Sequence, residues 1–164
     1  MSPFARDLMQ RNVAIIDAQA SLLELERAFE EARISGFPVV EGGRVVGVVS
    51  RADVLRQLGG KPGEEPLLST YYADLASFES EHARESFADA AARSGKTTDQ
   101  LRVSDLMTPS AVTVAPDATL HDVARTLIEH RIHRALVTDA GTLVGIVSSL
   151  DIVRLVAEEK LGPV

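Results

Sequence analysis

The sequence predicts an α/β protein, of the α+β kind, built from two copies of one small β-α-β-β-α unit. Two observations lead to this prediction. The first is an internal repeat, because an offset of 98 residues takes Asp7 to Asp105 and Asp53 to Asp151 without a gap. The second is that both copies show the same order of apolar patterns, with strand and helix periods in the same places.

The repeat holds one register from Asp7 to Arg56. Chance does not maintain one register over so many identities, so we interpret the chain as a duplication. Further identical pairs include Leu8-Met9 and Leu106-Met107, Leu22 and Leu120, Arg33-Ile34 and Arg131-Ile132, Val39 and Val137, Gly43 and Gly141, Val46-Gly47 and Val144-Gly145, Val49-Ser50 and Val147-Ser148, and Arg56 and Arg154.

Each copy begins with a short apolar strand, Val13 to Ile16 in the first and Val112 to Val114 in the second. A helix is expected to start at Ser21 and at Thr119, where the apolar residues change to helical spacing. The stripe consists of Leu22, Leu25, Phe29 and Ala32 in copy one and of Leu120, Val123 and Leu127 in copy two.

Two strands and a second helix complete each copy. The strands flank the turns Glu41-Gly42-Gly43 and Asp139-Ala140-Gly141, and the helices begin near Ser50 and Ser148. One unit of about 55 residues barely buries a core alone. We therefore expect the two copies to pack about a pseudo-two-fold axis, which would create two related clefts.

The predicted organisation is a first repeat over 1–58, a linker with a helical insert over 59–102, and a second repeat over 103–164. Gly59 to Pro66 is typical of a linker, and a helix is predicted from about Ser69 to Arg93, ending at Ser94-Gly95. Its stripe is Tyr71, Leu75, Phe78 and His82, continued by Phe87, Ala90 and Ala91. An aromatic stripe needs cover, either from the chain's own repeats or from a second copy in a homodimer.

Composition excludes several classes of protein. There is no Cys, no apolar signal-peptide region in Met1 to Gln10 and no apolar run long enough to span a bilayer, so we expect a cytoplasmic protein without a membrane partner. The net charge is −7 and no basic cluster is present, which argues against nucleic-acid binding. A small anionic ligand stays compatible with an acidic chain.

Several motifs resemble those of a known family. Gly47 to Asp53 and Gly145 to Asp151 both follow a Gly-apolar-apolar-Ser-x-x-Asp pattern. Gly36-Phe37-Pro38-Val39 and Ile132-His133-Arg134-Ala135-Leu136-Val137 resemble two variants of one strand, and Leu106-Met107-Thr108-Pro109 resembles a short leading motif. The chain is similar, over about two thirds of its length, to a tandem pair of CBS domains, called a Bateman module.

The resemblance implies that the clefts bind an adenine nucleotide or a related adenosine compound: AMP, ADP, ATP, NAD or S-adenosylmethionine. Asp53 and Asp151 would hold the ribose diol, with Ser50 and Ser148 meeting a phosphate or sugar oxygen. Further implied contacts lie near Gly36, Phe37, Pro38, Ala14, Val112 and Ala135, several of which equally suit a simple core. No catalytic cofactor is implied.

The two copies differ where a phosphate would be bound. His133 and Arg134 are implied phosphate contacts, and the equivalent positions of copy one are Ser35 and Gly36. We therefore predict that the cleft of Arg134, Ser148 and Asp151 prefers a phosphorylated ligand. Copy two also has Leu136 where copy one has Pro38, which leaves an additional N–H.

A purely structural interpretation competes with this site. Ser50-x-x-Asp53 and Ser148-x-x-Asp151 also fit the capping box, as do Ser21-x-x-Glu24 and Thr119-x-x-Asp122, which we interpret as plain caps. His121, His130 and His133 lack the spacing of a structural zinc site, so no metal is expected.

The sequence favours a regulatory module that senses an adenine ligand, forms a homodimer and acts on an unidentified partner protein. The alternative is a structural dimerisation module without a nucleotide ligand. A hydrolase using His133 with Ser148 or Asp151 is the third hypothesis, although no P-loop or Gly-x-Ser-x-Gly nucleophile motif is present.

Overall fold

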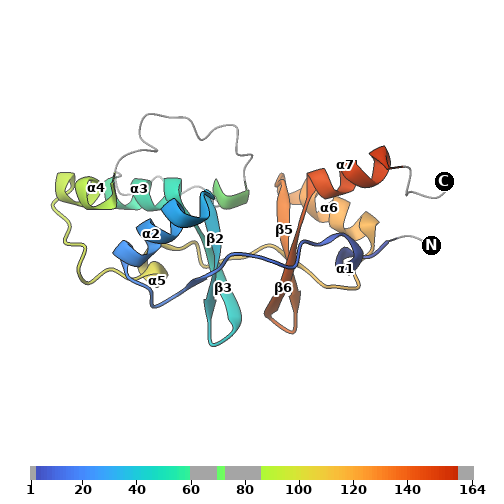
Figure 1. Ribbon diagram of the computed structural model, residues 1–164, viewed down its shortest axis with the longest axis horizontal. Helices are drawn as coiled ribbons and strands as arrows, with labels where there is room; N and C mark the ends of the chain where they lie inside the picture. Colours follow the sequence, from blue (N-terminus) through green and yellow to red (C-terminus); the bar gives the residue numbers. More distant parts are fainter. Residues whose placement is uncertain (1–2, 60–69, 73–85, 159–164) are drawn as a thin grey trace. The chain divides into compact units, whose positions relative to one another are not determined.

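The computed structural model describes residues 3–59, 70–72 and 86–158, which belong to two compact units. One unit comprises Ala14–Ala111, and the other joins Met1–Val13 to Val112–Val164 (Figure 1). Each unit contains a three-stranded sheet with helices packed against it, as the repeat predicts.

The unit of the first repeat is built on the hairpin of β2 (Gly36–Glu41) and β3 (Arg44–Ser50), with β1 (Ile16–Asp17) parallel to β2. Gly42 and Gly43 turn the hairpin with φ values of 57° and 79°, the left-handed region that such turns require. In the register of this hairpin Gly36 lies opposite Ser50, which brings two predicted site positions together.

The helices of this unit are α2 (Leu22–Ala32) and α3 (Arg51–Gly59). Ser21 starts α2 with a capping box, since its hydroxyl accepts the Glu24 N–H at 3.2 Å and its own N–H donates to the Glu24 carboxylate at 2.6 Å. The core between the helices and the sheet includes Leu22, Leu25, Phe29, Phe37, Val39, Val49, Val54 and Leu58.

The unit of the second repeat has the same order of elements: β4 (Thr113–Val114), α6 (Leu120–His130), β5 (Arg134–Asp139), β6 (Thr142–Ser148) and α7 (Ser149–Ala157). Thr119 caps α6, and Ala140 and Gly141 turn the hairpin with φ values of 48° and 86°. Arg134 lies opposite Ser148, as Gly36 lies opposite Ser50. The predicted β-α-β-β-α order is confirmed in both copies.

The two repeats exchange their leading segments. The short helix α1 (Ala5–Leu8) belongs to the unit of the second repeat, where the Ala5 N–H donates to the Ala118 carbonyl at 2.8 Å. Its equivalent α5 (Val103–Leu106) belongs to the unit of the first repeat, where the Val103 N–H donates to the carbonyl of Ala20 at 2.9 Å. The compact units therefore differ from the sequence repeats by one segment each.

The insert packs against its own chain in the residues described. The helix α4 (Phe87–Arg93) lies beside α3 and α2 (Figure 1), and its Phe87, Ala90 and Ala91 are fully buried. It ends as expected, with Ser94 as the C-cap and Gly95 at a φ of 69°.

Part of the predicted insert helix is wrong, because Tyr71 lies in a short 3₁₀ turn, η1 (Thr70–Tyr72), and not in an α-helix. The helical spacing of Tyr71 with later residues is therefore not evidence for a helix at that position. Leu75, Phe78 and His82 lie outside the described residues. No helix in the described part of the chain has the length and apolar character that a bilayer span requires.

Candidate functional site

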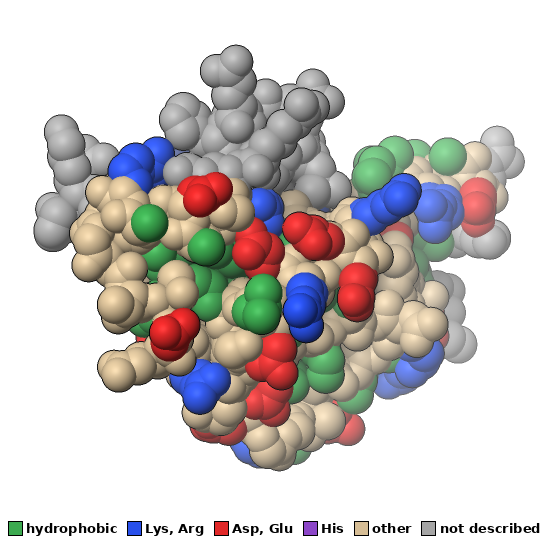
Figure 2. All heavy atoms as spheres, turned by 60° about the vertical axis from the view of Figure 1, so that its left-hand side comes forward, with side chains coloured by type: hydrophobic (Ala, Val, Ile, Leu, Met, Phe, Trp, Pro, Cys, Tyr) green, Lys and Arg blue, Asp and Glu red, His purple; other side chains and the backbone are tan. Residues whose placement is uncertain are grey.

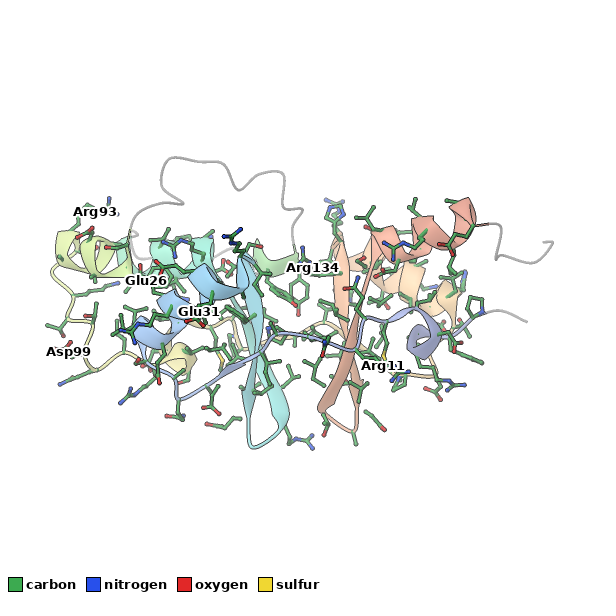
Figure 3. The ribbon with its side chains drawn as sticks, in the orientation of Figure 1. Arg11, Glu26, Glu31, Arg93, Asp99 and Arg134 are labelled. Carbon is green, nitrogen blue, oxygen red and sulfur yellow. The ribbon has the colours of Figure 1, made fainter. Side chains whose placement is uncertain are left out.

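The second repeat brings Arg134, Ser148 and Asp151 to one end of its sheet. Arg134 is the first residue of β5, Ser148 is the last residue of β6 on the neighbouring strand, and Asp151 follows in the first turn of α7. Arg134, labelled in Figure 3, is half-buried. A cation, a hydroxyl and a carboxylate thus gather where a strand ends and a helix begins, a place that suits a phosphorylated ligand.

Asp151 also completes the capping box that the spacing predicts. Its Oδ2 accepts the Ser148 N–H at 2.8 Å and the Ser148 hydroxyl at 2.7 Å. Its Oδ1 accepts one long hydrogen bond, 3.4 Å, from the Gln10 side chain. The two carboxylate oxygens are therefore used differently, and Oδ1 is the one whose bond a ligand hydroxyl can replace at small cost.

Gln10 contacts this candidate site, although no motif in the sequence points to it. It lies on the exchanged leading segment, where its N–H and carbonyl pair with Ile146 of β6 at 2.8 and 3.0 Å. The equivalent residue of the other copy, Thr108, pairs with Val48 in the same way at 2.8 and 3.0 Å. The repeat offset alone relates Gln10 to Thr108, but only the exchange brings Gln10 to Asp151.

The first repeat has the same residue types, Ser50 and Asp53, but the carboxylate has a different hydrogen-bond partner. Ser50 accepts the Asp53 N–H at 3.0 Å, as a cap does. The Asp53 carboxylate also accepts a hydrogen bond from the Arg56 guanidinium. Ser50 and Asp53 are both fully buried, so this carboxylate is already desolvated and paired with a cation.

The residues expected near an adenine fall into two groups. Phe37, Pro38 and Ala135 are buried, and the Phe37 ring packs on Phe29 with the centroids 5.0 Å apart, which supports the core interpretation for these side chains. Ala14 is exposed and Val112 is half-buried. Of the apolar candidates, these last two have side-chain surface that a ligand can reach.

His133 precedes Arg134 and is exposed, while its carbonyl accepts the Ser149 N–H at 2.9 Å. Its ring is therefore available to a phosphate while its backbone fixes the start of α7. Within the described ranges, no three His, Asp or Glu side chains gather as metal ligands do. On the face that Figure 2 shows, Lys and Arg side chains are interspersed with Asp and Glu, without the basic stripe of a nucleic-acid interface.

A separate depression of about 350 Å³ lies in the unit of the first repeat. Glu26 and Asp99, labelled in Figure 3, border it, and the other lining residues are Ser21, Leu22, Leu23, Phe87, Ala88 and Thr98. The Glu26 carboxylate there accepts the Phe87 N–H at 2.9 Å. The depression contains none of the predicted ligand residues and follows the seam between α2 and α4.

The fold and these strand-to-helix groups define a known class of protein. The sequence model of the CBS domain matches residues 5–60 and 103–158, so this chain belongs to the CBS domain family and carries a tandem CBS pair, or Bateman module. Among its relatives is the uncharacterized protein MJ1426 of Methanocaldococcus jannaschii, which is 28% identical over 152 residues, with 90% of this chain and 88% of the relative covered.

Two further relatives bear on function. The chloroplastic CBS domain-containing protein CBSX2 of Arabidopsis thaliana is 29% identical over 153 residues, covering 92% of this chain and 61% of that protein. The crystal structure of CBSX2 in complex with AMP matches with a TM-score of 0.65 at 25% identity, covering 96% of this chain and 98% of the other. Inosine-5'-monophosphate dehydrogenase of Korarchaeum cryptofilum is 26% identical, but the match covers 90% of this chain and only 23% of that enzyme.

Proposed function

We propose that this chain is a regulatory module that binds an adenosine ligand with a phosphate group at the second repeat and acts on a partner protein. The observation that carries the proposal is the hydrogen bonding of Asp151, whose Oδ1 accepts the long 3.4 Å bond from Gln10 at the end of the sheet where the half-buried Arg134 lies opposite Ser148. The similarity to CBSX2, whose crystal structure contains AMP, supports this ligand class.

The chemistry of binding follows from the groups present. The Asp151 Oδ1 accepts hydrogen bonds from a ribose hydroxyl, and Arg134 with His133 binds the phosphate. AMP, ADP, ATP and NAD carry both features, whereas S-adenosylmethionine lacks the phosphate. We therefore expect the phosphorylated compounds to bind more tightly.

Ligand binding at Asp151 gives a route to regulation. A ribose hydroxyl that takes Oδ1 displaces the Gln10 side chain, and Gln10 belongs to the exchanged segment that includes α1. A change in how this segment pairs with Ile146 is the conformational difference that a partner protein would recognise. The cytoplasmic location expected from the sequence stays a prediction.

A thermal-shift panel of AMP, ADP, ATP, NAD and S-adenosylmethionine tests the function. A ligand at 100 times its Kd stabilises the folded protein by about 2.7 kcal/mol. Asp151→Ala is expected to abolish the response, and a wild-type response in this variant would contradict the site. Chromatography of the recovered nucleotide should show it unchanged, because the proposal includes no catalysis.

Replacing Arg134 separates phosphate binding from nucleoside binding. Arg134→Ala removes charge-assisted hydrogen bonds worth about 1.5–3 kcal/mol, which corresponds to a loss in AMP affinity of roughly 10- to 150-fold. Adenosine, which has no phosphate, serves as the matched control and should bind the variant as it binds the wild type. Equal losses for AMP and adenosine would contradict the assigned role of Arg134.

The alternative function, a dimerisation module, is favoured by one specific observation. Four apolar side chains on α6 and α7 are exposed: Ile128 at 75%, Leu150 at 71%, and Val153 and Val156 at 58% each. In the first repeat, Glu30 stands at the position of Ile128, and Leu58, at the position of Val156, is fully buried on the helix that α4 covers. The second repeat thus exposes an apolar face whose equivalent the insert covers.

A second copy of this chain is the partner that suits this face. Arg154 on α7 and Glu129 on α6 are both exposed, so a two-fold copy can place opposite charges against each other around an apolar centre. Light scattering should give a dimer mass, and Leu150→Glu should give a monomer. Leu23→Glu, which changes an equally exposed apolar residue on α2, is the control that should remain dimeric. A wild-type monomer would reject this role.

A further inference from the structure

The 3₁₀ turn η1 presses an aromatic ring against the start of β2. A Cβ atom placed on Gly36 would lie 2.4 Å from Cδ2 and 3.3 Å from Cε2 of Tyr71, whereas carbon atoms in contact are about 3.5–4.0 Å apart. The Tyr71 ring therefore lies directly on the Gly36 backbone. Figure 1 shows η1, the short green helix, beside the start of β2.

The repeat offset shows which residue of the second repeat corresponds to Gly36 in this contact. Gly36 is the equivalent of Arg134, and each lies opposite the Ser of its own signature, Ser50 or Ser148. The Tyr71 ring thus fills the volume in which the Arg134 side chain begins in the other copy. In the first repeat, an aromatic group of the insert lies where the second repeat carries its phosphate-binding cation.

The ring is packed as a core residue is packed. Tyr71 is 3% exposed and Tyr72 is 1% exposed, and their rings meet edge to face with the centroids 5.2 Å apart. A tyrosine that stacks on a base must present an open ring face to it, and a side chain as buried as Tyr71 has none. Tyr71 therefore excludes a ligand from this position and does not bind one.

The Asp53 carboxylate of the first repeat is also poorly placed to bind a ligand. Asp53 is fully buried and accepts from the Arg56 guanidinium, whereas Asp151 holds only a long bond on its Oδ1. A ribose that bound to Asp53 would have to displace both the charge-assisted bond and the ring above Gly36. At the equivalent carboxylate, Asp151, the Oδ1 accepts the long bond from Gln10, and Arg154, the equivalent of Arg56, is exposed.

We propose that the insert closes the ligand position of the first repeat with Tyr71, so that the chain binds one adenosine ligand, at Asp151. This inference rests on the proposed function for the identity of the ligand. It assigns Tyr71 as the residue that sets the stoichiometry. Removal of the ring should open the position of Ser50 and Asp53 to a second, weaker ligand.

Calorimetric titration with AMP tests the closure. We expect one site in the wild type, two in Tyr71→Ala, and again one in Tyr71→Ala/Asp53→Ala. Phe87→Ala is the matched control, since Phe87 is an equally buried aromatic residue of the insert that is not among the atoms nearest Gly36, and its stoichiometry should stay at one. Two sites in the wild type, or one site in both the wild type and Tyr71→Ala, would overturn the proposal.

Failure of the closure and failure of the proposed function give different results. A wild type that binds no AMP while Tyr71→Ala binds one would refute the function at Asp151 and leave the closure standing. One site in both proteins, lost in Asp151→Ala, would refute the closure and leave the function standing.

Tyrosine fluorescence tests the closure in the wild type, so the result does not depend on whether Tyr71→Ala folds. The chain has two Tyr residues and no Trp, so intrinsic emission reports only on Tyr71 and Tyr72. Acrylamide should quench this emission weakly in the wild type, and saturation with AMP should not change the quenching. Quenching that rises in step with AMP binding would show that the ligand displaces the ring, and would overturn the closure.

Discussion

The packing of the insert on its own chain makes Phe87→Ala the most informative stability variant. Phe87 is fully buried, its ring meets Phe29 edge to face at 6.0 Å, and the Arg51 guanidinium lies 4.8 Å from its centroid. Truncation of a buried Phe to Ala costs about 3–5 kcal/mol. For a chain of this size that loss lowers Tm by roughly 6–20 °C, and it is a large part of the ~5–15 kcal/mol by which native proteins are stable.

Urea unfolding followed by circular dichroism, at two protein concentrations tenfold apart, measures this loss. Because Phe87 packs within its own unit, the loss should be the same at both concentrations. Ala88→Ser, an exposed position on the same helix, is the control and should stay within about 0.5 kcal/mol of the wild type. A loss below 1 kcal/mol, or one that grows on dilution, would refute the packing of α4 in its own chain and favour an interface with a second copy.

Three further expectations concern single positions. Gly47→Ala places a Cβ 2.4 Å from the backbone oxygen of Thr108 and should destabilise by about 1–3 kcal/mol in chemical denaturation. Among the described residues, the Cβ of Gly59→Ala comes within 4 Å of the end of the flexible Arg93 side chain alone, at 2.6 Å, so the variant's stability should equal or exceed that of the wild type by up to about 1 kcal/mol. The Ser21 backbone and hydroxyl hydrogen bonds at the N-cap hold the pKa of Glu24 below its usual 4.5, so Glu24→Gln should lower Tm at pH 7. The difference in Tm between the wild type and this variant should vanish as pH falls below 4.5 through the lowered pKa. A difference in Tm that persists at the lowest pH would contradict this reasoning.

Local signals account for the part of the fold that the sequence could predict. Ser21 and Thr119 start their helices with capping boxes, and the Gly-containing turns close both hairpins, because these features depend on residues within a few positions of one another. The repeat then supplied the equivalence of the two copies. With these signals the family, the order of elements and the position of Ser148 and Asp151 beside Arg134 could all be predicted.

Non-local contacts account for the part that could not be predicted. The exchange of α1 and α5 between units depends on packing over about a hundred residues, and no local pattern records it. Gln10 reaches Asp151 only through this exchange. Tyr71 was assigned to a helical stripe because its spacing fits one, whereas its contact with Gly36 decides its conformation.

The two signature aspartates show why a motif does not by itself define a site. Asp53 and Asp151 occupy the same place in the repeat and both follow a capping Ser. Both carboxylates are buried, but Asp53 is paired with Arg56, while Asp151 uses Oδ2 for its cap and keeps Oδ1 on a long bond. Arg154, the equivalent of Arg56, is exposed, so the difference lies in which cation turns toward the carboxylate. The free energy that a ligand would have to supply at Asp53 includes breaking the ion pair between this buried carboxylate and the partly exposed Arg56, which favours Asp151 as the position where a ligand binds.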